Sequence, residues 1–148
     1  MKKLVIVNKG HGFVGKSSSI KMVYQKLKSL YPSNIKVINE AKHKDDDITA
    51  VIDVCGVLVG IESQGDPNSR MFNTLPKFVE MGCEIIVCAC RTWGETKKKI
   101  ESLNKDGFDI IWTTNPRNKN LADELNTLWA DMVIDIIEMW IKDNKNNL

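Results

Sequence analysis

The stretch VNKGHGFVGKSSSI, residues 7–20, decides the fold that we expect for this chain. An apolar run of strand length, Leu4–Val7, leads into it, and apolar residues at helical spacing follow it. Between the two, Gly10–Ser17 matches the pattern G-x-x-x-x-G-K-[ST] in full. A strand, a glycine-rich loop and an amphipathic helix in that order form the context in which this pattern binds phosphate. We therefore predict a phosphate-binding loop rather than a structural turn, which is the alternative interpretation of the same glycines.

The chemistry of phosphate binding explains each position of this loop. Its glycines let backbone N–H groups curve around the phosphates, because no Cβ stands in the way. Lys16 places a positive charge on the β- and γ-phosphates, and Ser17 can ligate Mg²⁺. The helix that begins here adds the positive end of its dipole. The residues predicted to bind the nucleotide are Gly10, His11, Gly12, Phe13, Val14, Gly15, Lys16, Ser17 and Ser18.

Strand and helix patterns alternate along the rest of the chain. Further strands are expected over residues 35–38, 48–54, 57–63, 84–90 and 109–114. Helices are expected over residues 16–31, 66–81, 92–106 and 120–142, with a kink or a break at Pro76 and a capping box at Thr92 and Glu95. Such alternation with apolar strands predicts an α/β fold, with a mostly parallel sheet between two helical layers. We take residues 1–143 as a single nucleotide-binding domain and 144–148 as a polar tail.

Two of the expected strands are too close in sequence for a parallel crossover. Only Cys55 and Gly56 separate residues 48–54 from 57–63, whereas a parallel connection needs about a dozen residues. These two strands should therefore form one antiparallel hairpin. The polar segment 40–47 has no clear pattern and is expected to be a loop, either a substrate flap or a tether. It contains His43, for which the sequence shows no partner in metal binding.

Composition excludes several classes of function. The chain has 148 residues, of which 43% are hydrophobic and 27% charged, with a net charge of +2. That charge is too small to favour nucleic acid or an anionic membrane as a partner. No stretch approaches the roughly 20 apolar residues of a membrane span, and the N-terminal apolar run is too short for a signal peptide. The four cysteines include no C-x-x-C pair, so we expect reduced thiols and a cytoplasmic location.

With this motif in this context, the chain resembles the P-loop NTPase superfamily, and most closely its small kinase-like and uncharacterised NTP-binding members. The resemblance implies a three-layer αβα fold, an ATP or GTP ligand with Mg²⁺, and a contact from Ser18 to the α-phosphate. One subgroup, the ParA/MinD-like ATPases, has a lysine directly after the first glycine of the loop. Here that position is His11, and Lys9 precedes Gly10, which argues against the subgroup. His11 either contacts phosphate or substrate or is an exposed filler.

A P-loop enzyme normally needs a second carboxylate near Mg²⁺. Asp53 follows an apolar run, but the hairpin places it at the far edge of the sheet, so we expect a structural role. Glu62 and Asp66 follow the next strand, at the carboxyl edge where ligands bind in open α/β sheets. Asp66 is also well placed as a helix N-cap before Pro67. We prefer Asp66 to Glu62, because the small residues 63–65 suit a loop that passes close to a ligand.

Three arginines are expected at the same edge. Arg91 and Arg117 each follow a predicted strand, and Arg70 lies in the first turn of a predicted helix. Each could stabilise the charge that develops in phosphoryl transfer, or form an ordinary surface salt bridge. We prefer Arg91, because its position is fixed between a buried strand and a helix. The predicted catalytic residues are thus Lys16, Asp66 and Arg91, and the predicted metal ligands are Ser17, Asp66 and Glu62.

The leading hypothesis is a Mg²⁺-dependent enzyme that hydrolyses ATP or GTP or transfers a phosphoryl group to a small acceptor. The chain has no arginine-rich lid insertion of the nucleoside-monophosphate kinase type, and no N-K-x-D of the GTPase type. An alternative is a nucleotide-dependent switch or binding protein that turns over slowly and acts through a partner. Its support is the wide apolar face of the last helix, which includes Trp129 and Trp140 and could form a homodimer or cover the sheet. A third possibility is a loop that holds a phosphorylated metabolite without hydrolysis.

Overall fold

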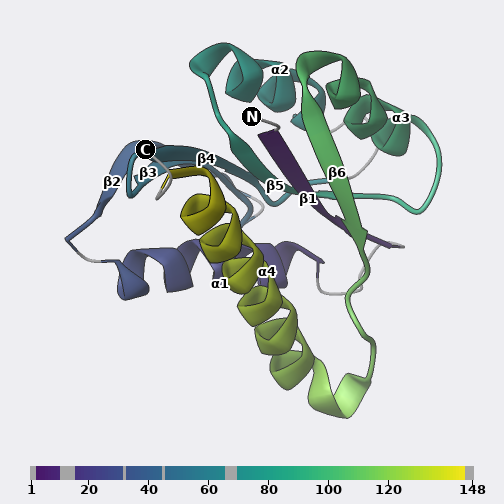
Figure 1. The fold of residues 1–148 in the computed structure, drawn as a ribbon. Coiled ribbons are helices and arrows are strands. Elements are labelled where there is room, and N and C mark those ends of the chain that lie inside the picture. The colour runs from purple at the N-terminus through teal and green to yellow at the C-terminus, as the bar shows by residue number, and fades with distance from the viewer. Residues whose placement is uncertain (1–2, 11–15, 32, 45, 66–69, 146–148) are drawn as a thin grey trace.

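The computed structural model describes residues 3–10, 16–31, 33–44, 46–65 and 70–145. In these residues six strands form one sheet, in the order β2-β3-β4-β5-β1-β6 (Figure 1). The strands are β1 (Lys3–Lys9), β2 (Ile35–Lys42), β3 (Ile48–Val54), β4 (Val57–Glu62), β5 (Ile85–Cys90) and β6 (Phe108–Thr113). The helices are α1 (Lys16–Leu30), α2 (Met71–Met81), α3 (Glu95–Glu101), the 3₁₀ helices η1 (Ser102–Asp106) and η2 (Lys119–Leu121), and α4 (Ala122–Lys145).

The sheet is parallel at its centre and antiparallel at one side. β1 pairs in parallel with β5 and with β6, and β5 pairs in parallel with β4. β3 runs antiparallel to both of its neighbours, β4 and β2. The predicted α/β class and the β3–β4 hairpin are therefore confirmed. The carboxyl ends of β4, β5, β1 and β6 share one edge of the sheet, and the start of β3 lies at that same edge.

The antiparallel part is larger than the sequence indicated. Residues 40–42 were expected in a loop, but they belong to β2, which pairs with β3 as far as Lys42 opposite Ile48. A β-bulge between Val37 and Asn39 shifts the register within β2. The bulge interrupts the alternation of side chains between the two faces, and this explains why the strand pattern ended early in the sequence. The connecting loop is reduced to residues 43–47.

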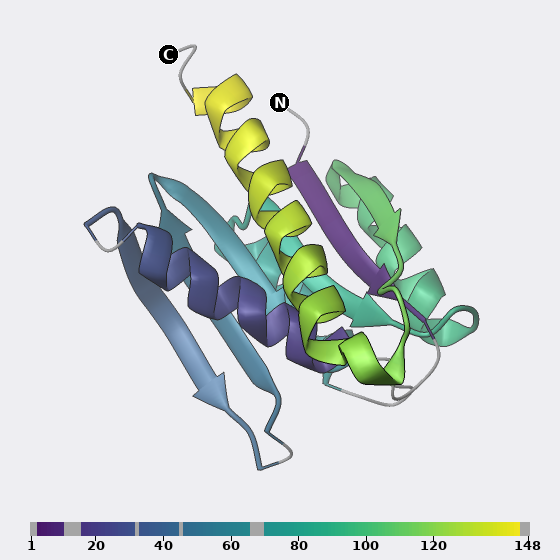
Figure 2. The same cartoon turned by 90° about the horizontal axis from the view of Figure 1, so that it is seen from below.

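Helices cover both faces of the sheet. α1 and α4 cross one face together (Figure 2), and α2 and α3 lie on the other. The apolar residues of the sheet divide between these faces as alternation requires: along β1, Leu4 and Ile6 pack toward α1 and α4, whereas Val5 and Val7 pack toward α2 and α3. None of the helices in the described residues has the length and apolarity that crossing a membrane requires.

Helix ends differ from the sequence prediction in three places. α2 begins at Met71 and continues unbroken through Pro76. The predicted capping box at Thr92 is wrong, because α3 begins after Gly94 without a side-chain cap. α4 continues to Lys145, so the expected polar tail starts within the helix. Gly82 ends α2 with a left-handed φ of 85°.

A glycine determines how closely α2 approaches the sheet. Gly60 lies in β4, and the ring of Phe78 from α2 rests directly on it: a Cβ at residue 60 would lie 2.7 Å from the ring. Both residues are buried. This contact places α2 over β4. On this face of the sheet, α2 therefore lies beside β2 and β3 and does not cover them.

Candidate functional site

The predicted phosphate loop leaves the sheet at the carboxyl edge of its buried strand β1. Gly10 follows β1, and its N–H donates to the carbonyl of Cys90 at the end of β5 (3.1 Å). The chain re-enters regular structure at Lys16, where α1 begins. The predicted strand before the glycine pattern and the predicted helix after it are thus confirmed, whereas residues 11–15 lie outside the described residues. The predicted contacts of His11, Gly12, Phe13, Val14, Gly15 and the side chain of Lys16 lie outside the described residues.

Connections diverge at this point of the sheet. From β1 the chain runs through α1 toward β2, on one side of β1 and across one face. From β5 it runs through α3 to β6, on the other side of β1 and across the other face. In open α/β sheets such a divergence leaves a crevice outside the carboxyl ends of the strands, and ligands bind there. The N-terminus of α1 lies at this edge.

Ser17 meets a carboxylate that sequence reasoning missed. Its hydroxyl donates to Oδ1 of Asp47, and the hydroxyl of Ser63 donates to the same oxygen (2.7 Å). Ser63 in turn accepts the N–H of Ile48 (2.9 Å). Asp47 precedes β3, and because β3 is antiparallel, its first residues lie beside the carboxyl end of β4. The hairpin places Asp53 at the edge of the sheet away from Ser17, as predicted. It also places Asp47 at the edge beside Ser17, and the sequence analysis did not infer this.

Asp53 has the structural role that the sequence predicted. Its carboxylate accepts the N–H of Gly56 in the β3–β4 turn (2.8 Å). The turn brings Cys55 and Gly56 to positive φ values of 53° and 88°. Asp53 therefore lies at the opposite end of β3 from Asp47 and takes no part in the candidate site.

Glu62 is fully buried and is surrounded by donors. Thr49 (2.8 Å) and Thr74 (3.0 Å) donate to its Oε1, and the N–H of Gln64 donates to Oε2 (3.2 Å). Nε of Arg70 lies 3.4 Å from Oε1. Burial raises the pKa of this carboxyl, and these four interactions act in the opposite direction without cancelling it. Glu62 therefore joins β3, β4 and α2, and its role as a metal ligand stays a prediction.

Arg70 links this buried carboxylate to Asp47. Its guanidinium NH2 lies 3.8 Å from Oδ2 of Asp47, and its side chain is 24% exposed. The other arginines lie differently: Arg91 follows β5 and its backbone N–H donates to Thr96 (3.0 Å), whereas Arg117 is exposed after β6. Of the three predicted arginines, Arg70 is the one that pairs with the carboxylate beside Ser17.

Asp66, the preferred acid of the sequence prediction, lies outside the described residues. The residue before it is informative. Gly65 is buried against the end of β5, where a Cβ would lie 2.2 Å from the carbonyl oxygen of Ala89. The neighbouring Cys90 carbonyl accepts the N–H of Gly10. The segment that leads to Asp66 thus passes the same strand end from which the predicted phosphate loop departs.

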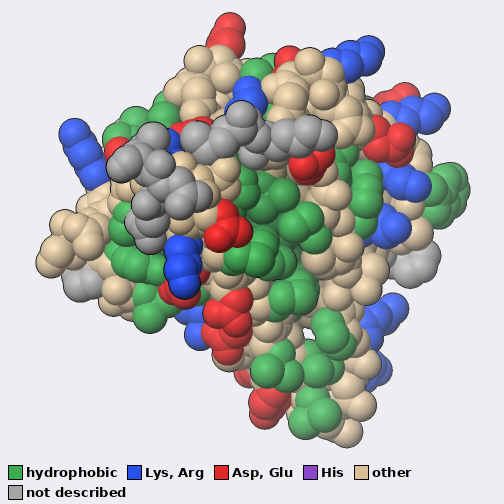
Figure 3. Space-filling view, viewed as in Figure 1, with side chains coloured by type: hydrophobic (Ala, Val, Ile, Leu, Met, Phe, Trp, Pro, Cys, Tyr) green, Lys and Arg blue, Asp and Glu red, His purple; other side chains and the backbone are tan. Residues whose placement is uncertain are grey.

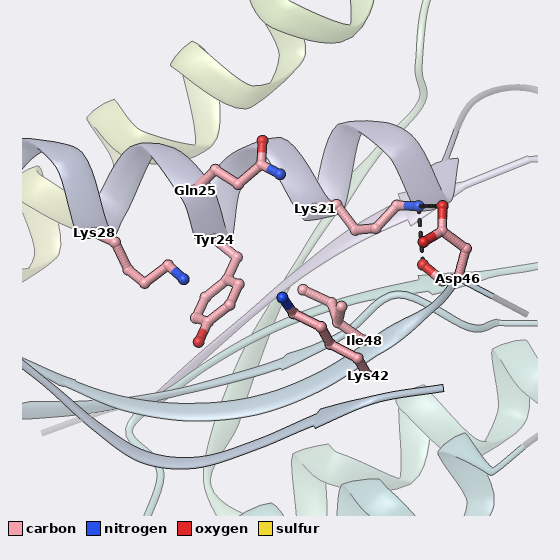
Figure 4. A pocket seen from close by; sticks show the side chains of 7 residues that line it. All are labelled: Lys21, Tyr24, Gln25, Lys28, Lys42, Asp46 and Ile48. Carbon is pink, nitrogen blue, oxygen red and sulfur yellow. Dashed lines mark hydrogen bonds and ion pairs between the residues drawn. The ribbon is translucent and has the colours of Figure 1, made fainter. Parts of the chain in front are cut away.

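Polar contacts along α1 hold the 43–47 loop against the helix. Lys21 donates to the carboxylate (3.1 Å) and to the carbonyl (3.0 Å) of Asp46, and Tyr24 donates to Glu40 on β2. A cavity of about 200 Å³ lies between α1 and the β2–β3 strands, and Figure 4 shows Lys21, Tyr24 and Lys28 along the helix on its wall. The Lys21–Asp46 pair thus lies one residue from Asp47, at the surface, where the Asp46 side chain is 95% exposed.

A buried polar chain anchors the two ends of the predicted phosphate loop. Nδ2 of Asn8, at the end of β1, donates to Ser19 on α1 (3.0 Å) and to Asn115 after β6 (3.2 Å). Nδ2 of Asn115 donates to Asn126 on α4 (2.7 Å). All four residues are buried. Because a buried amide or hydroxyl without a partner is costly, these bonds fix the backbone before and after the loop.

The oxygen atoms of Ser17 and Asp47 fit Mg²⁺. Hydroxyl and carboxylate oxygens are the hard donors that this ion prefers, and it usually binds through one or two carboxylates together with phosphates and water. Among the described residues there is no group of three or more His, Cys, Asp and Glu side chains placed to hold a metal ion. Comparison of the chain with protein-family models, with curated proteins and with solved structures finds no match.

The raised pKa of Glu62 predicts a pH-dependent stability. Folded Glu62 binds its proton more tightly than unfolded Glu62, so the protonated form favours folding. We expect the free energy of unfolding of the wild type, relative to Glu62→Gln, to fall as the pH rises from 4.5 through the raised pKa. Urea denaturation between pH 4.5 and 8 measures this difference, with exposed Glu101→Gln as the control for removing one charge. A difference that stays constant or grows with pH would contradict the assignment.

Proposed function

We propose that this chain binds ATP or GTP together with Mg²⁺ at the carboxyl edge of β1, and hydrolyses the nucleotide or transfers its γ-phosphoryl group to a small acceptor. One observation carries the proposal. The sequence Gly10–Ser17 lies between the buried strand β1 and the N-terminus of α1, where the strand connections diverge. Free backbone N–H groups and the helix dipole at such a terminus favour phosphate. This is the arrangement of the P-loop NTPase fold, which we propose for the chain.

We assign phosphate binding and metal binding to different residues according to their chemistry. Lys16 and the loop N–H groups hold the β- and γ-phosphates, and Ser18 contacts the α-phosphate, which its exposure in the first turn of α1 allows. Ser17 and Asp47 hold the metal, whose charge, when it is bound, neutralises the phosphate oxygens. Asp66 and Glu62 were the acids that the sequence favoured. Asp47 is preferred because its carboxylate already contacts Ser17.

Phosphoryl transfer then requires a nucleophile and a cation near the γ-phosphate. An oxygen of water or of the acceptor attacks the γ-phosphorus, the bond to the bridging oxygen breaks, and the nucleoside diphosphate leaves. Arg91 is the arginine that we propose for the developing charge, because it follows the strand whose last carbonyl binds Gly10. Arg70 holds Asp47 and Glu62, and positions the metal acid rather than the phosphate.

Removing the loop lysine tests nucleotide binding. In calorimetric titrations with ATP and with GTP, each with and without Mg²⁺, we expect saturable binding to the wild type. Lys16→Ala should weaken it by about tenfold or more, because a hydrogen bond from a charged group contributes about 1.5–3 kcal/mol. Lys28→Ala, on the same helix and far from the loop, should bind as the wild type does. Binding of undiminished affinity in Lys16→Ala, or no binding of either nucleotide to the wild type, would contradict the proposal.

Adjacent aspartates provide a matched test of the metal acid. Asp46 and Asp47 are neighbours, but only Asp47 contacts Ser17, whereas the side chain of Asp46 is 95% exposed. We expect Asp47→Asn to abolish the increase in nucleotide affinity that Mg²⁺ produces, and Asp46→Asn to preserve it. The measurement is the ratio of the dissociation constants with and without Mg²⁺. If Asp66→Asn removes this effect and Asp47→Asn does not, the metal acid is Asp66.

The exposed face of α4 favours a second candidate function, that of a nucleotide-dependent switch which dimerises. Trp129 and Trp140, on which the sequence prediction relied, are buried in the core instead. Leu128, Met132 and Met139 are 63%, 39% and 56% exposed on this helix, and Leu121 is 48% exposed in the preceding η2. Hydrophobic side chains lie along α4 on the face that Figure 3 shows, with acidic side chains beside them. Exposed apolar groups at helical spacing are typical of helix pairing, although scattered ones are also ordinary on surfaces.

Light scattering separates the two candidates. An enzyme that acts alone should remain a monomer with and without Mg²⁺-nucleotide, and should show steady turnover. A switch should double its mass when Mg²⁺-nucleotide is added, and Leu128→Asp should prevent this because it places a charge within the paired face. A mass that is independent of both nucleotide and substitution would exclude the switch.

A further inference from the structure

A groove lies on the face of the sheet opposite α1. It encloses about 350 Å³ between α2 and the β2–β3 strands. On α2 its wall is formed by residues 70, 73, 74, 77, 78 and 81, which recur at helical spacing and form one face of the helix. The groove exists because the contact of Phe78 with Gly60 seats α2 over β4, beside rather than above β2 and β3.

The polar wall of the groove is fixed from behind by Glu62. Thr49, Thr74 and Arg70 line the groove, and all three interact with the buried Glu62 carboxylate. The hydroxyl of Thr49 gives its single proton to this carboxylate, so it accepts from Nε2 of His43 (2.8 Å). These bonds hold the lining side chains in one arrangement before any ligand arrives, which reduces the entropy cost of binding.

The charge of the lining is positive. It includes Arg70 and Lys77 and contains neither Asp nor Glu. Arg70 is balanced by Glu62 and Asp47, whereas Lys77 has no ion pair or hydrogen bond to any other described residue. The amides of Asn39 and Asn73 add neutral donors, and Met81, which is 40% exposed, adds an apolar surface.

We propose that this groove binds a small organic anion. A carboxylate, phosphate or sulfonate of the ligand pairs with Lys77 and accepts from the nearby amides, and an apolar body packs on Met81. A cavity of this size with an apolar surface and a few convergent polar groups is typical of small-molecule sites. The proposal does not depend on nucleotide binding, because none of the groove residues belongs to the predicted phosphate loop.

A fluorescent organic anion tests the site. The probe is 1-anilinonaphthalene-8-sulfonate, and its neutral counterpart, N-phenyl-1-naphthylamine, has the same aromatic body without the charge. We expect the wild type to bind the sulfonate more tightly than the neutral amine. Lys77→Gln should weaken sulfonate binding by about fivefold, in line with a partly exposed charge pair, and should leave amine binding unchanged. Asn73→Asp, which adds a negative charge without removing the lysine, should weaken sulfonate binding similarly.

Two controls make the outcome decisive. Lys28→Gln removes a lysine from the cavity beside α1, and Lys16→Ala disables the predicted phosphate loop; both should bind the sulfonate as the wild type does. The perturbed amide resonances of the bound protein should map to α2 and β3. Equal sulfonate binding by the wild type, Lys77→Gln and Asn73→Asp, or perturbations that map to α4, would overturn the proposal. Loss of nucleotide binding in Lys16→Ala with sulfonate binding intact would show that the two sites are independent.

Discussion

The carboxylate of Asp47 is the interaction on which the candidate site depends. One of its oxygens accepts from Ser17 at the start of α1 and from Ser63 after β4, and the other faces Arg70 at the start of α2. Three segments far apart in sequence thus meet on one side chain. This is possible because β3 runs antiparallel to β4, which brings its first residues to the edge where the parallel strands end. Without that reversal, Asp47 would not lie beside Ser17 at the start of α1.

The structure around the proposed loop is fixed on both sides. The Asn8 and Asn115 chain holds the end of β1 against α1 and α4, while Lys21 joins α1 to Asp46 and Tyr24 joins it to Glu40 on β2. Groups that are already in position when a ligand binds need little reorganisation, which is the condition for strong electrostatic stabilisation of a phosphoryl group. Arg70 contacts the Asp47 cluster and also lines the groove beside α2, so one side chain adjoins both proposed sites.

Local sequence patterns predicted much of this fold, and contacts across the sheet account for the rest. The apolar run before Gly10 predicted β1, and the helical spacing after Ser17 predicted α1. The two-residue gap at Cys55 and Gly56 predicted the hairpin and the antiparallel direction of its strands. The extension of β2 was not predictable, because a bulge breaks its alternation and its pairing with β3 is not local. Asp47 was missed for the same reason: it lies in a polar run without any pattern, and only the direction of the hairpin could have indicated it.

The most direct test of the proposed nucleotide and Mg²⁺ site is a crystal structure of the wild type with Mg²⁺ and the β,γ-imido analogue of the nucleotide that binds. We expect a triphosphate at the N-terminus of α1 and a metal ion about 2.1 Å from Oγ of Ser17. The Asp47 carboxylate should bind that ion directly or through water. A nucleotide bound elsewhere, or a metal ion that contacts neither Ser17 nor Asp47, would contradict it.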